Sequence, residues 1–152
     1  MSLTPMRRTI IILALVVFAA AQFKTVERIN PPIESDLPAA PHVKSFLKRA
    51  CYDCHSYETE WRWYSYVAPV SWVVARHVYN GRDVLNFSKW DSYSRGAKGR
   101  HLSDSILSMQ DGTMPTWDYL IAHPSAKLSP EEVESFKEWA NDYLNGSGNS
   151  AE

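Results

Sequence analysis

The residues with the most distinctive chemistry form a single C-x-x-C-H motif, Cys51-Tyr52-Asp53-Cys54-His55, which uses both cysteines of the chain. This pattern is typical of a c-type haem attachment site. Two thiols at this spacing can each add to one vinyl group of the same porphyrin and form two thioethers. The histidine that follows can coordinate the iron through a neutral imidazole nitrogen. The motif therefore predicts one covalent haem c, attached through Cys51 and Cys54, with His55 as proximal ligand.

Three other interpretations of the same motif are a chance pattern, a dithiol redox pair and half of a zinc site. A zinc site needs two further ligands at a compatible spacing, and the sequence has no second cysteine pair. A thioredoxin-type pair is expected near a βαβ pattern, which the sequence does not show. Haem attachment explains the motif better than these alternatives.

The candidate for the sixth iron ligand is Met114, which lies in a Gly-Thr-Met-Pro loop over residues 112–115. A thioether is a soft ligand suited to haem iron, and His/Met ligation raises the reduction potential. Pro115 restricts the backbone after the methionine. The alternative role for Met114 is ordinary packing, since methionine fills gaps readily. Its rivals are Met109, which is better explained as core, and the histidines, which are expected as surface or packing residues: His42, His77, His101 and His123.

Residues 1–27 are predicted to be a signal peptide or a membrane anchor. Arg7 and Arg8 precede a continuously apolar run over 10–18, and small residues follow up to Ala21, as in a secretory signal. The apolar run is short for a membrane span, which needs about 20 residues. Cleavage after Ala21 and retention as an anchor both remain open. In either case we expect the rest of the chain to be periplasmic or anchored facing the periplasm.

The remaining chain divides into a linker, one domain and a tail. Residues 28–41 contain Pro31, Pro32, Pro38 and Pro41, which disfavour helix and favour an extended linker. Such a linker would space the domain from the membrane if the anchor is kept. Residues 42–145 are predicted to form the c-type haem-binding domain, and residues 146–152 a polar tail.

We predict a helix over residues 42–50, directly before the motif. Val43, Phe46 and Leu47 follow a helical i, i+3, i+4 spacing on one face. This helix runs directly into Cys51, so its packing sets the position of the attachment residues.

A second helix closes the domain. Ser129 and Glu132 form a capping-box pattern around Pro130, and Asn145-Gly146 is a stop signal. No alternating strand pattern is visible, so we predict an all-α fold, a class I cytochrome c-like helical domain. In that arrangement the two helices cross, with Phe46 and Leu47 facing Trp139 or Tyr143.

Composition narrows the function further. The chain has a net charge of −1, and removal of residues 1–21, which contain Arg7 and Arg8 and no acidic residue, leaves 14 basic and 17 acidic residues, or −3. There is no basic stripe for nucleic acid. Six Trp and eight Tyr suit the lining of a flat macrocycle. We expect the aromatic stretch 61–72 to wrap one haem edge and Arg62 to donate to the propionates, although a plain aromatic core is the alternative.

Two longer segments carry a family resemblance. Residues 51–90, CYDCHSYETEWRWYSYVAPVSWVVARHVYNGRDVLNFSKW, resemble the bacterial haem-binding domain family, whose hallmark is C-Y-D-C-H-S-x-x-T followed by W-x-W-Y and A-P-V-S-W. Residues 112–129 are similar to its later G-x-M-P-x-W-x-Y-L-x-x-H-P-x-A-x-L-S segment. The similarity covers residues 28–144 and is much more specific than C-x-x-C-H alone.

The resemblance implies an exported haem-binding domain that is often tethered to a membrane. It gives the thioether roles to Cys51 and Cys54 and the proximal role to His55, and it supports Met114 as distal ligand. Thr116 departs from the pattern, because the family commonly has a second proline there, and this leaves the loop less rigid. The physiological role of the family is poorly defined, so the resemblance names no redox partner.

The sequence as a whole is interpreted as a monohaem c-type cytochrome domain that transfers electrons in the periplasm, an electron carrier rather than an enzyme. If Met114 does not bind iron, the alternative is a haem-based peroxidase or gas sensor with an open distal site. A third interpretation is a haem-binding subunit of a larger redox complex.

Overall fold

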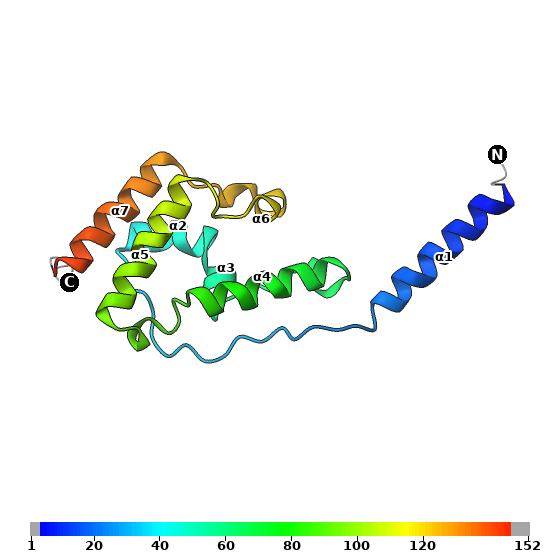
Figure 1. The fold of residues 1–152 in the computed structure, drawn as a ribbon, viewed down its shortest axis with the longest axis horizontal. Helices are drawn as coiled ribbons and strands as arrows, with labels where there is room; N and C mark the ends of the chain where they lie inside the picture. The colour runs from blue at the N-terminus through cyan, green and yellow to red at the C-terminus, as the bar shows by residue number, and fades with distance from the viewer. Residues whose placement is uncertain (1–3, 147–152) are drawn as a thin grey trace.

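The computed structural model describes residues 4–146, which fold into α-helices joined by irregular segments and short 3₁₀ turns (Figure 1). The described residues form no β-strand, only an isolated bridge between Ser35 and Lys89. This confirms the predicted all-α class. In chain order the elements are α1 (Pro5–Ala21), α2 (Pro41–Ala50), α3 (Tyr52–His55), η1 (Trp63–Tyr66), α4 (Val70–Val84), η2 (Trp90–Ser92), α5 (Arg95–Gln110), α6 (Trp117–Ala122), η3 (Pro124–Ala126) and α7 (Pro130–Leu144).

The core forms where α2 packs against α7. Val43, Phe46 and Leu47 are buried on the predicted face of α2, and they share one apolar cluster with Phe136 and Ala140 of α7. Trp139 and Tyr143, the residues expected opposite α2, are only partly buried at the edge of this cluster. The predicted pairing of the two helices is therefore present, but its centre lies at smaller and more deeply buried α7 residues.

The ends of α7 follow the sequence signals. The Ser129 hydroxyl accepts from the Glu132 backbone N–H at 3.2 Å, and the Glu132 carboxylate accepts from the Ser129 N–H at 2.9 Å. This reciprocal capping box satisfies two of the free N–H groups at a helix start. The helix ends at Leu144, and Gly146 adopts a positive φ of 80°, which glycine tolerates without steric cost. The remainder of the predicted polar tail, residues 147–152, lies outside the described residues.

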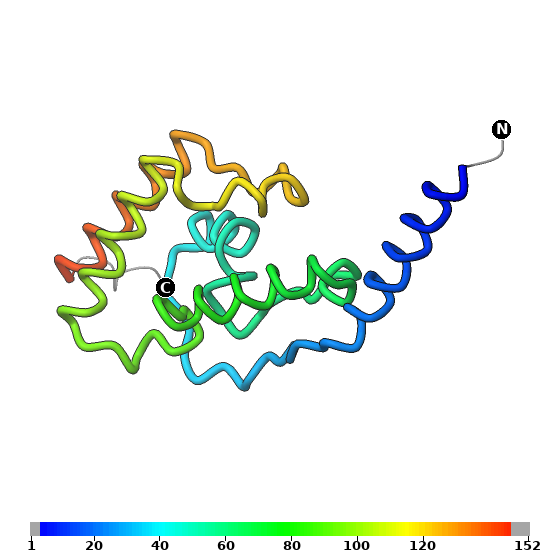
Figure 2. Tube along the Cα trace, turned by 45° about the vertical axis from the view of Figure 1, so that its right-hand side comes forward, coloured from blue at the N-terminus to red at the C-terminus, as the bar shows by residue number. Residues whose placement is uncertain are grey.

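Helix α1 projects away from the other helices and is solvent-exposed along most of its length (Figures 1 and 2). Among residues 4–146, no helix is both long and apolar enough to cross a membrane. A signal or anchor role for residues 1–27 stays a prediction. The Gln22 side chain fixes the end of α1 to the body: its amide nitrogen donates to the Ala68 carbonyl at 3.3 Å, and its oxygen accepts from the Ala68 N–H at 3.0 Å.

Residues 23–40, here called the strap, contain the predicted linker except Pro41, which begins α2, and run in extended form beside α4 (Figures 1 and 2). Side chains of α4 at helical spacing donate to backbone carbonyls of the strap, so one face of the helix holds the segment. The strap is therefore bound to the domain along its length and is not a free spacer. The three bonds are Trp72 Nε1 to Lys24 O (2.9 Å), Tyr79 OH to Glu27 O (2.8 Å) and Arg82 Nη1 to Ile29 O (2.9 Å).

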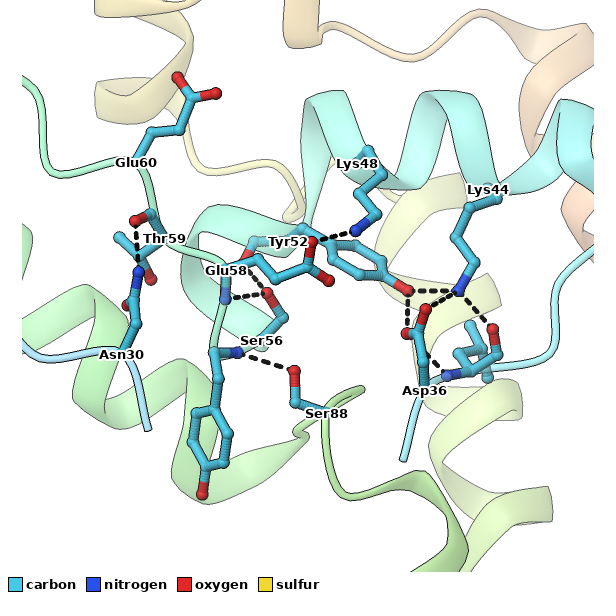
Figure 3. Close-up of polar contacts among 12 residues, drawn as sticks. Asn30, Asp36, Lys44, Lys48, Tyr52, Ser56, Glu58, Thr59, Glu60 and Ser88 are labelled. Carbon is cyan, nitrogen blue, oxygen red and sulfur yellow. Dashed lines mark hydrogen bonds and ion pairs between the residues drawn. The ribbon is translucent and has the colours of Figure 1, made fainter. Parts of the chain in front are cut away.

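The far end of the strap enters the core just before α2. Leu37 is 1% exposed and joins the apolar cluster. Next to it, the Asp36 carboxylate accepts from Lys44 Nζ and from the Tyr52 hydroxyl, both at 2.6 Å (Figure 3). Because Lys44 lies on α2 and Tyr52 on α3, this cluster ties the strap to the two helices that carry the motif.

Candidate functional site

The C-x-x-C-H motif adopts a helical turn that places its three chemical residues together. The Cys51 carbonyl accepts from the backbone N–H of Cys54 at 3.1 Å and from that of His55 at 2.9 Å. Residues at i, i+3 and i+4 share one face of a helix, so both thiols and the imidazole point the same way. All three residues line one cavity of about 360 Å³.

Met114 lines the same cavity, although it lies far from the motif in sequence. The structure thus brings together all four predicted site residues, from α3 and the residue that precedes it, Cys51, and from the loop between α5 and α6. The cavity is partly open to solvent and most of its surface is apolar. Apolar side chains in its wall include Ala50, Val84, Leu85, Phe87, Met109 and Leu128.

The His55 ring is held by the loop that follows α4. Its Nδ1 atom lies 3.1 Å from the Leu85 carbonyl oxygen, and the Phe87 N–H donates to the His55 carbonyl at 2.8 Å. A carbonyl can only accept, so Nδ1 carries the proton and Nε2 keeps a free lone pair. This is the arrangement in which a second partner orients a metal-binding histidine. Burial lowers the pKa of His55 although the bond to Leu85 opposes this, which favours the neutral, ligating form.

The two thiols are in the protonated form at neutral pH. Burial raises the pKa of Cys51 to about 12, and the neighbouring Cys54 thiol adds to this effect. Burial likewise raises the pKa of Cys54 to about 12, with a further contribution from Asp53. Since the thiolate is the reactive species in disulfide exchange, these surroundings disfavour the dithiol redox interpretation of the motif.

The Met114 loop is a compact turn built on the end of α5. Gly112 has a positive φ of 72°, the conformation that commonly ends a helix. The Met114 N–H then donates back to the Ser108 carbonyl at 3.0 Å, and the Thr113 hydroxyl donates to Asp111 at 2.7 Å. The Met114 side chain is 42% exposed, so it stands at the mouth of the cavity.

Some of the rival ligands also reach this cavity. Met109 packs against the core, as expected, but it lines the cavity as well. His77 and His101 contribute to the same wall, whereas His42 and His123 do not line it. Met109, His77 and His101 are therefore the alternatives to Met114 as the distal iron ligand.

The aromatic stretch 61–72 lies beside this cavity and is not part of its wall. None of its residues lines the cavity with the cysteines, and Arg62 pairs with Glu60 at 2.7 Å. Asp53 explains why the stretch lies outside this cavity. It belongs to α3 but does not line the cavity. Its carbonyl accepts from the Thr59 hydroxyl at 2.6 Å and its carboxylate from the Glu60 N–H at 2.8 Å, so the chain is held on the Asp53 side of α3. That this stretch wraps a haem edge stays a prediction: Tyr64, Ser65 and Val70 line a neighbouring cavity, which shares Cys54 with this one.

Two supports of the site were missed in the sequence. The loop over residues 85–88 carried no recognisable signal, because it acts on His55 mainly through backbone atoms. Gly81 of α4 is the second: a Cβ atom there would lie 2.5 Å from the Cys54 carbonyl oxygen. A glycine inside a helical pattern was the available signal for this close approach.

Further hydrogen bonds clamp the end of α3 (Figure 3). The Ser56 hydroxyl donates to the Tyr52 carbonyl at 2.7 Å, and the Tyr57 N–H donates to the Ser88 hydroxyl at 2.9 Å. Arg82 Nε donates to the Ser56 carbonyl at 2.7 Å. The attachment helix is thus fixed on the strap, on α4 and on the loop after α4.

Comparison with known proteins gives a consistent result. No curated protein and no solved structure matches the chain significantly. A family model described as a haem-binding domain matches residues 11–142, a range that includes Cys51, Cys54, His55 and Met114. Because this match covers most of the sequence, the chain belongs to the haem-binding domain family.

Proposed function

We propose that this chain is a monohaem c-type cytochrome domain that carries electrons outside the cytoplasm. The observation that supports this most directly is the single cavity lined by Cys51, Cys54, His55 and Met114. Two neutral thiols, an oriented imidazole and a thioether are the donor set that covalent attachment and His/Met ligation require.

Each residue has a defined role in the proposal. Cys51 and Cys54 would hold the haem through two thioethers, each formed by addition of the thiol across one vinyl group, with the thiol hydrogen going to the other vinyl carbon. His55 offers Nε2 as the proximal ligand, with its ring held through Nδ1 by Leu85. Met114 offers its sulfur as the distal ligand. Bound haem supplies a one-electron iron couple.

The electron-carrier role follows from saturated ligation. If His55 and Met114 both bind the iron, no coordination position would be left for a substrate. The cavity is partly open to solvent, which gives a redox partner access to one edge. Export is part of the proposal because Arg7, Arg8 and the apolar run over 10–18 have the pattern of a targeting segment. If this segment is retained, it tethers the domain to the membrane.

Covalent attachment is tested by producing the full chain in a periplasm with c-type haem maturation. We expect the wild type and a Ser92→Ala control to retain haem stain on a denaturing gel. Cys51→Ala and Cys54→Ala should each leave at most one thioether, visible as a changed pyridine haemochrome spectrum. A wild-type chain without covalent haem would contradict the proposal and return both cysteines to thiol chemistry.

The distal ligand is tested with a matched pair of variants, Met114→Leu and Met109→Leu. Both methionines line the cavity, and leucine is close to methionine in volume, so packing changes little in either case. We expect only Met114→Leu to lose the methionine–iron charge-transfer band and to bind carbon monoxide in the reduced form. Carbon monoxide binding by the wild type would instead favour a sensor or peroxidase with an open site. A stoichiometric protein that co-purifies would favour a subunit of a larger redox complex.

A further inference from the structure

Two cavities lie between α6 and the rest of the domain. The first contains the four proposed haem-binding residues, and the second, of about 400 Å³, is bounded by η1, α4 and α6. Three residues line both cavities and therefore stand between them: Cys54, His77 and Tyr119. Tyr119 is the one that α6 contributes, so its side chain is the part of α6 that reaches between the cavities.

Helix α6 follows the Met114 loop directly but has little apolar contact with the domain. None of its residues is buried, and Trp117 and Ile121 are 76% and 72% exposed. Within residues 4–146, the element that α6 packs against most closely is η3, the turn that comes after it. Since its apolar packing is sparse, polar contacts decide how far α6 lies from the C-x-x-C-H motif.

Met114 is joined to α6 through a short, constrained segment. Pro115 restricts the backbone after the methionine, and the carbonyl of Thr116, the N-cap of α6, accepts from the Leu120 N–H at 3.1 Å. On its other side, the Met114 N–H is bound to the Ser108 carbonyl of α5. A displacement of α6 therefore displaces Met114 as well.

The Tyr119 hydroxyl fastens α6 to the interior of the motif. It donates to Asp53 Oδ2 at 2.8 Å, whereas Asp53 Oδ1 accepts from the Glu60 N–H. The Arg49 carbonyl oxygen lies 3.5 Å from the same hydroxyl, at the limit of a hydrogen bond, so the carboxylate is the main acceptor. Burial and the charge of Asp53 raise the pKa of Tyr119, so the hydroxyl keeps its proton and remains a donor.

The other polar contacts of this segment reach different elements. His77 Nε2 of α4 lies 3.5 Å from Asp118 Oδ2, which is too long for a firm hydrogen bond. The Tyr64 hydroxyl of η1 lies 2.5 Å from Nε2 of His123, the residue that ends α6. Of the three contacts, that of Tyr119 is the one that reaches the motif.

We propose that Tyr119 is a positioning residue for the distal iron ligand. Through Asp53, its hydroxyl holds the Met114 loop at the distance from the motif that allows Met114 and His55 to bind one iron. Tyr119 itself binds neither iron nor substrate. The inference rests on the proposed His55 and Met114 ligation, and it assigns control of how readily Met114 gives way to an external ligand.

The test measures how readily imidazole displaces Met114 in the oxidised, haem-loaded full chain, followed through the methionine–iron charge-transfer band. We expect Tyr119→Phe to raise the apparent affinity for imidazole by about tenfold, the equivalent of one hydrogen bond to a charged group. Phenylalanine keeps the ring, which stacks on His123 with centroids 4.2 Å apart, so only the hydroxyl is lost.

Tyr143→Phe is the matched control. The Tyr143 hydroxyl accepts from Trp90 Nε1 at 3.0 Å, and Tyr143 lines neither cavity. The control variant also loses one hydrogen bond, so its melting temperature should fall, but its affinity for imidazole should equal that of the wild type. A purely structural role of Tyr119 would make the two variants alike.

Two further measurements identify the partner and the segment that moves. In an Asp53→Ala background, Tyr119→Phe should change the imidazole affinity by less than about twofold, because the acceptor is already absent. Hydrogen exchange followed by mass spectrometry, without imidazole, should be faster over residues 111–123 in Tyr119→Phe than in the wild type or in Tyr143→Phe.

The outcomes separate this inference from the proposed function. A wild-type chain that lacks the methionine–iron band would refute Met114 as distal ligand and, with it, the role of Tyr119. If the band is present, equal imidazole affinities of Tyr119→Phe and Tyr143→Phe would overturn the role of Tyr119 alone. So would a full tenfold effect of Tyr119→Phe in the Asp53→Ala background, because the hydroxyl would then act through another partner.

Discussion

Gly81 offers a direct test of how α4 holds the attachment helix. Its missing side chain allows the backbones of α3 and α4 to approach, and a Cβ atom would lie 2.5 Å from the Cys54 carbonyl oxygen and 3.0 Å from its carbonyl carbon. These are backbone atoms of the motif and cannot rotate away. Real Cβ contacts are essentially never below 3.0 Å, so Gly81→Ala must push the two helices apart by about half an ångström.

The size of the effect follows from two opposing contributions. Replacing a helical glycine with alanine stabilises a helix by about 0.5–1 kcal/mol, whereas overpacking costs about 1–3 kcal/mol. For Gly81→Ala we expect a net loss of about 1–2 kcal/mol, or a fall of roughly 3–8 °C in melting temperature. Gly99→Ala in α5 is the control, because its Cβ would lie 3.8 Å from the nearest atom, an ordinary contact. It should raise the free energy of unfolding by about 0.5–1 kcal/mol.

Urea and thermal unfolding of the haem-loaded variants measure both values. The visible spectrum adds an independent measure, because a displaced Cys54 backbone also shifts His55 relative to the loop after α4. We expect Gly81→Ala to alter the spectrum and Gly99→Ala to leave it unchanged. Equal stabilisation of the chain by the two alanines would refute the close approach of α3 and α4 described here.

Two further predictions concern the strap and the cluster at its end. Besides the carbonyls of Ile29 and Ser56, Arg82 donates to Asn30 Oδ1 at 2.7 Å and to Thr59 Oγ1 at 3.0 Å. Arg82→Lys keeps the charge but cannot reach all four acceptors, so we expect a loss of about 1–3 kcal/mol in the free energy of unfolding and faster trypsin cleavage within the strap. The exposed Arg76→Lys on the same helix is the control, and equal cleavage of both variants would contradict the binding of the strap by Arg82. Burial opposes ionisation of Asp36, but hydrogen bonds from Lys44 and Tyr52 outweigh it and hold its pKa below the ordinary 3.8. Its contribution to stability is therefore present above pH 3.8 and is lost as the pH falls through the lower, folded-state value. Asp36→Asn should flatten the pH dependence of unfolding below pH 3.8, and an unchanged slope would argue against the cluster.

The helices next to the motif and at the C-terminus could be predicted because their signals are local. Spacing alone identified the buried face of α2, and the capping box around Pro130 identified the start of α7. The placement of Phe136 and Ala140 at the centre of their contact, in place of Trp139 and Tyr143, depends on how closely two helices approach. That distance is decided by tertiary packing and is not present in the periodicity of either helix.

The residues of the site likewise divide into those with a local sequence signal and those whose role depends on the tertiary fold. Cys51, Cys54 and His55 were found because one helical turn brings them together, and Met114 because its loop has a recognisable composition. The role of Leu85 could not be found, since any residue has a carbonyl oxygen to offer His55. The position of the aromatic stretch outside the wall of the first cavity could not be predicted, because the bonds from Thr59 and Glu60 to Asp53 redirect the chain over a few residues, and such a turn has no periodic signature.

The way in which the strap is bound has a consequence for how this segment can change over evolution. Trp72, Tyr79 and Arg82 bind its main-chain carbonyls, which are present whatever the side chains of the strap are. Substitutions between residues 24 and 29 should therefore be tolerated at many positions. An inserted or deleted residue would shift every later carbonyl away from its donor, so relatives that keep these three donors are expected to vary in strap sequence but to conserve its length.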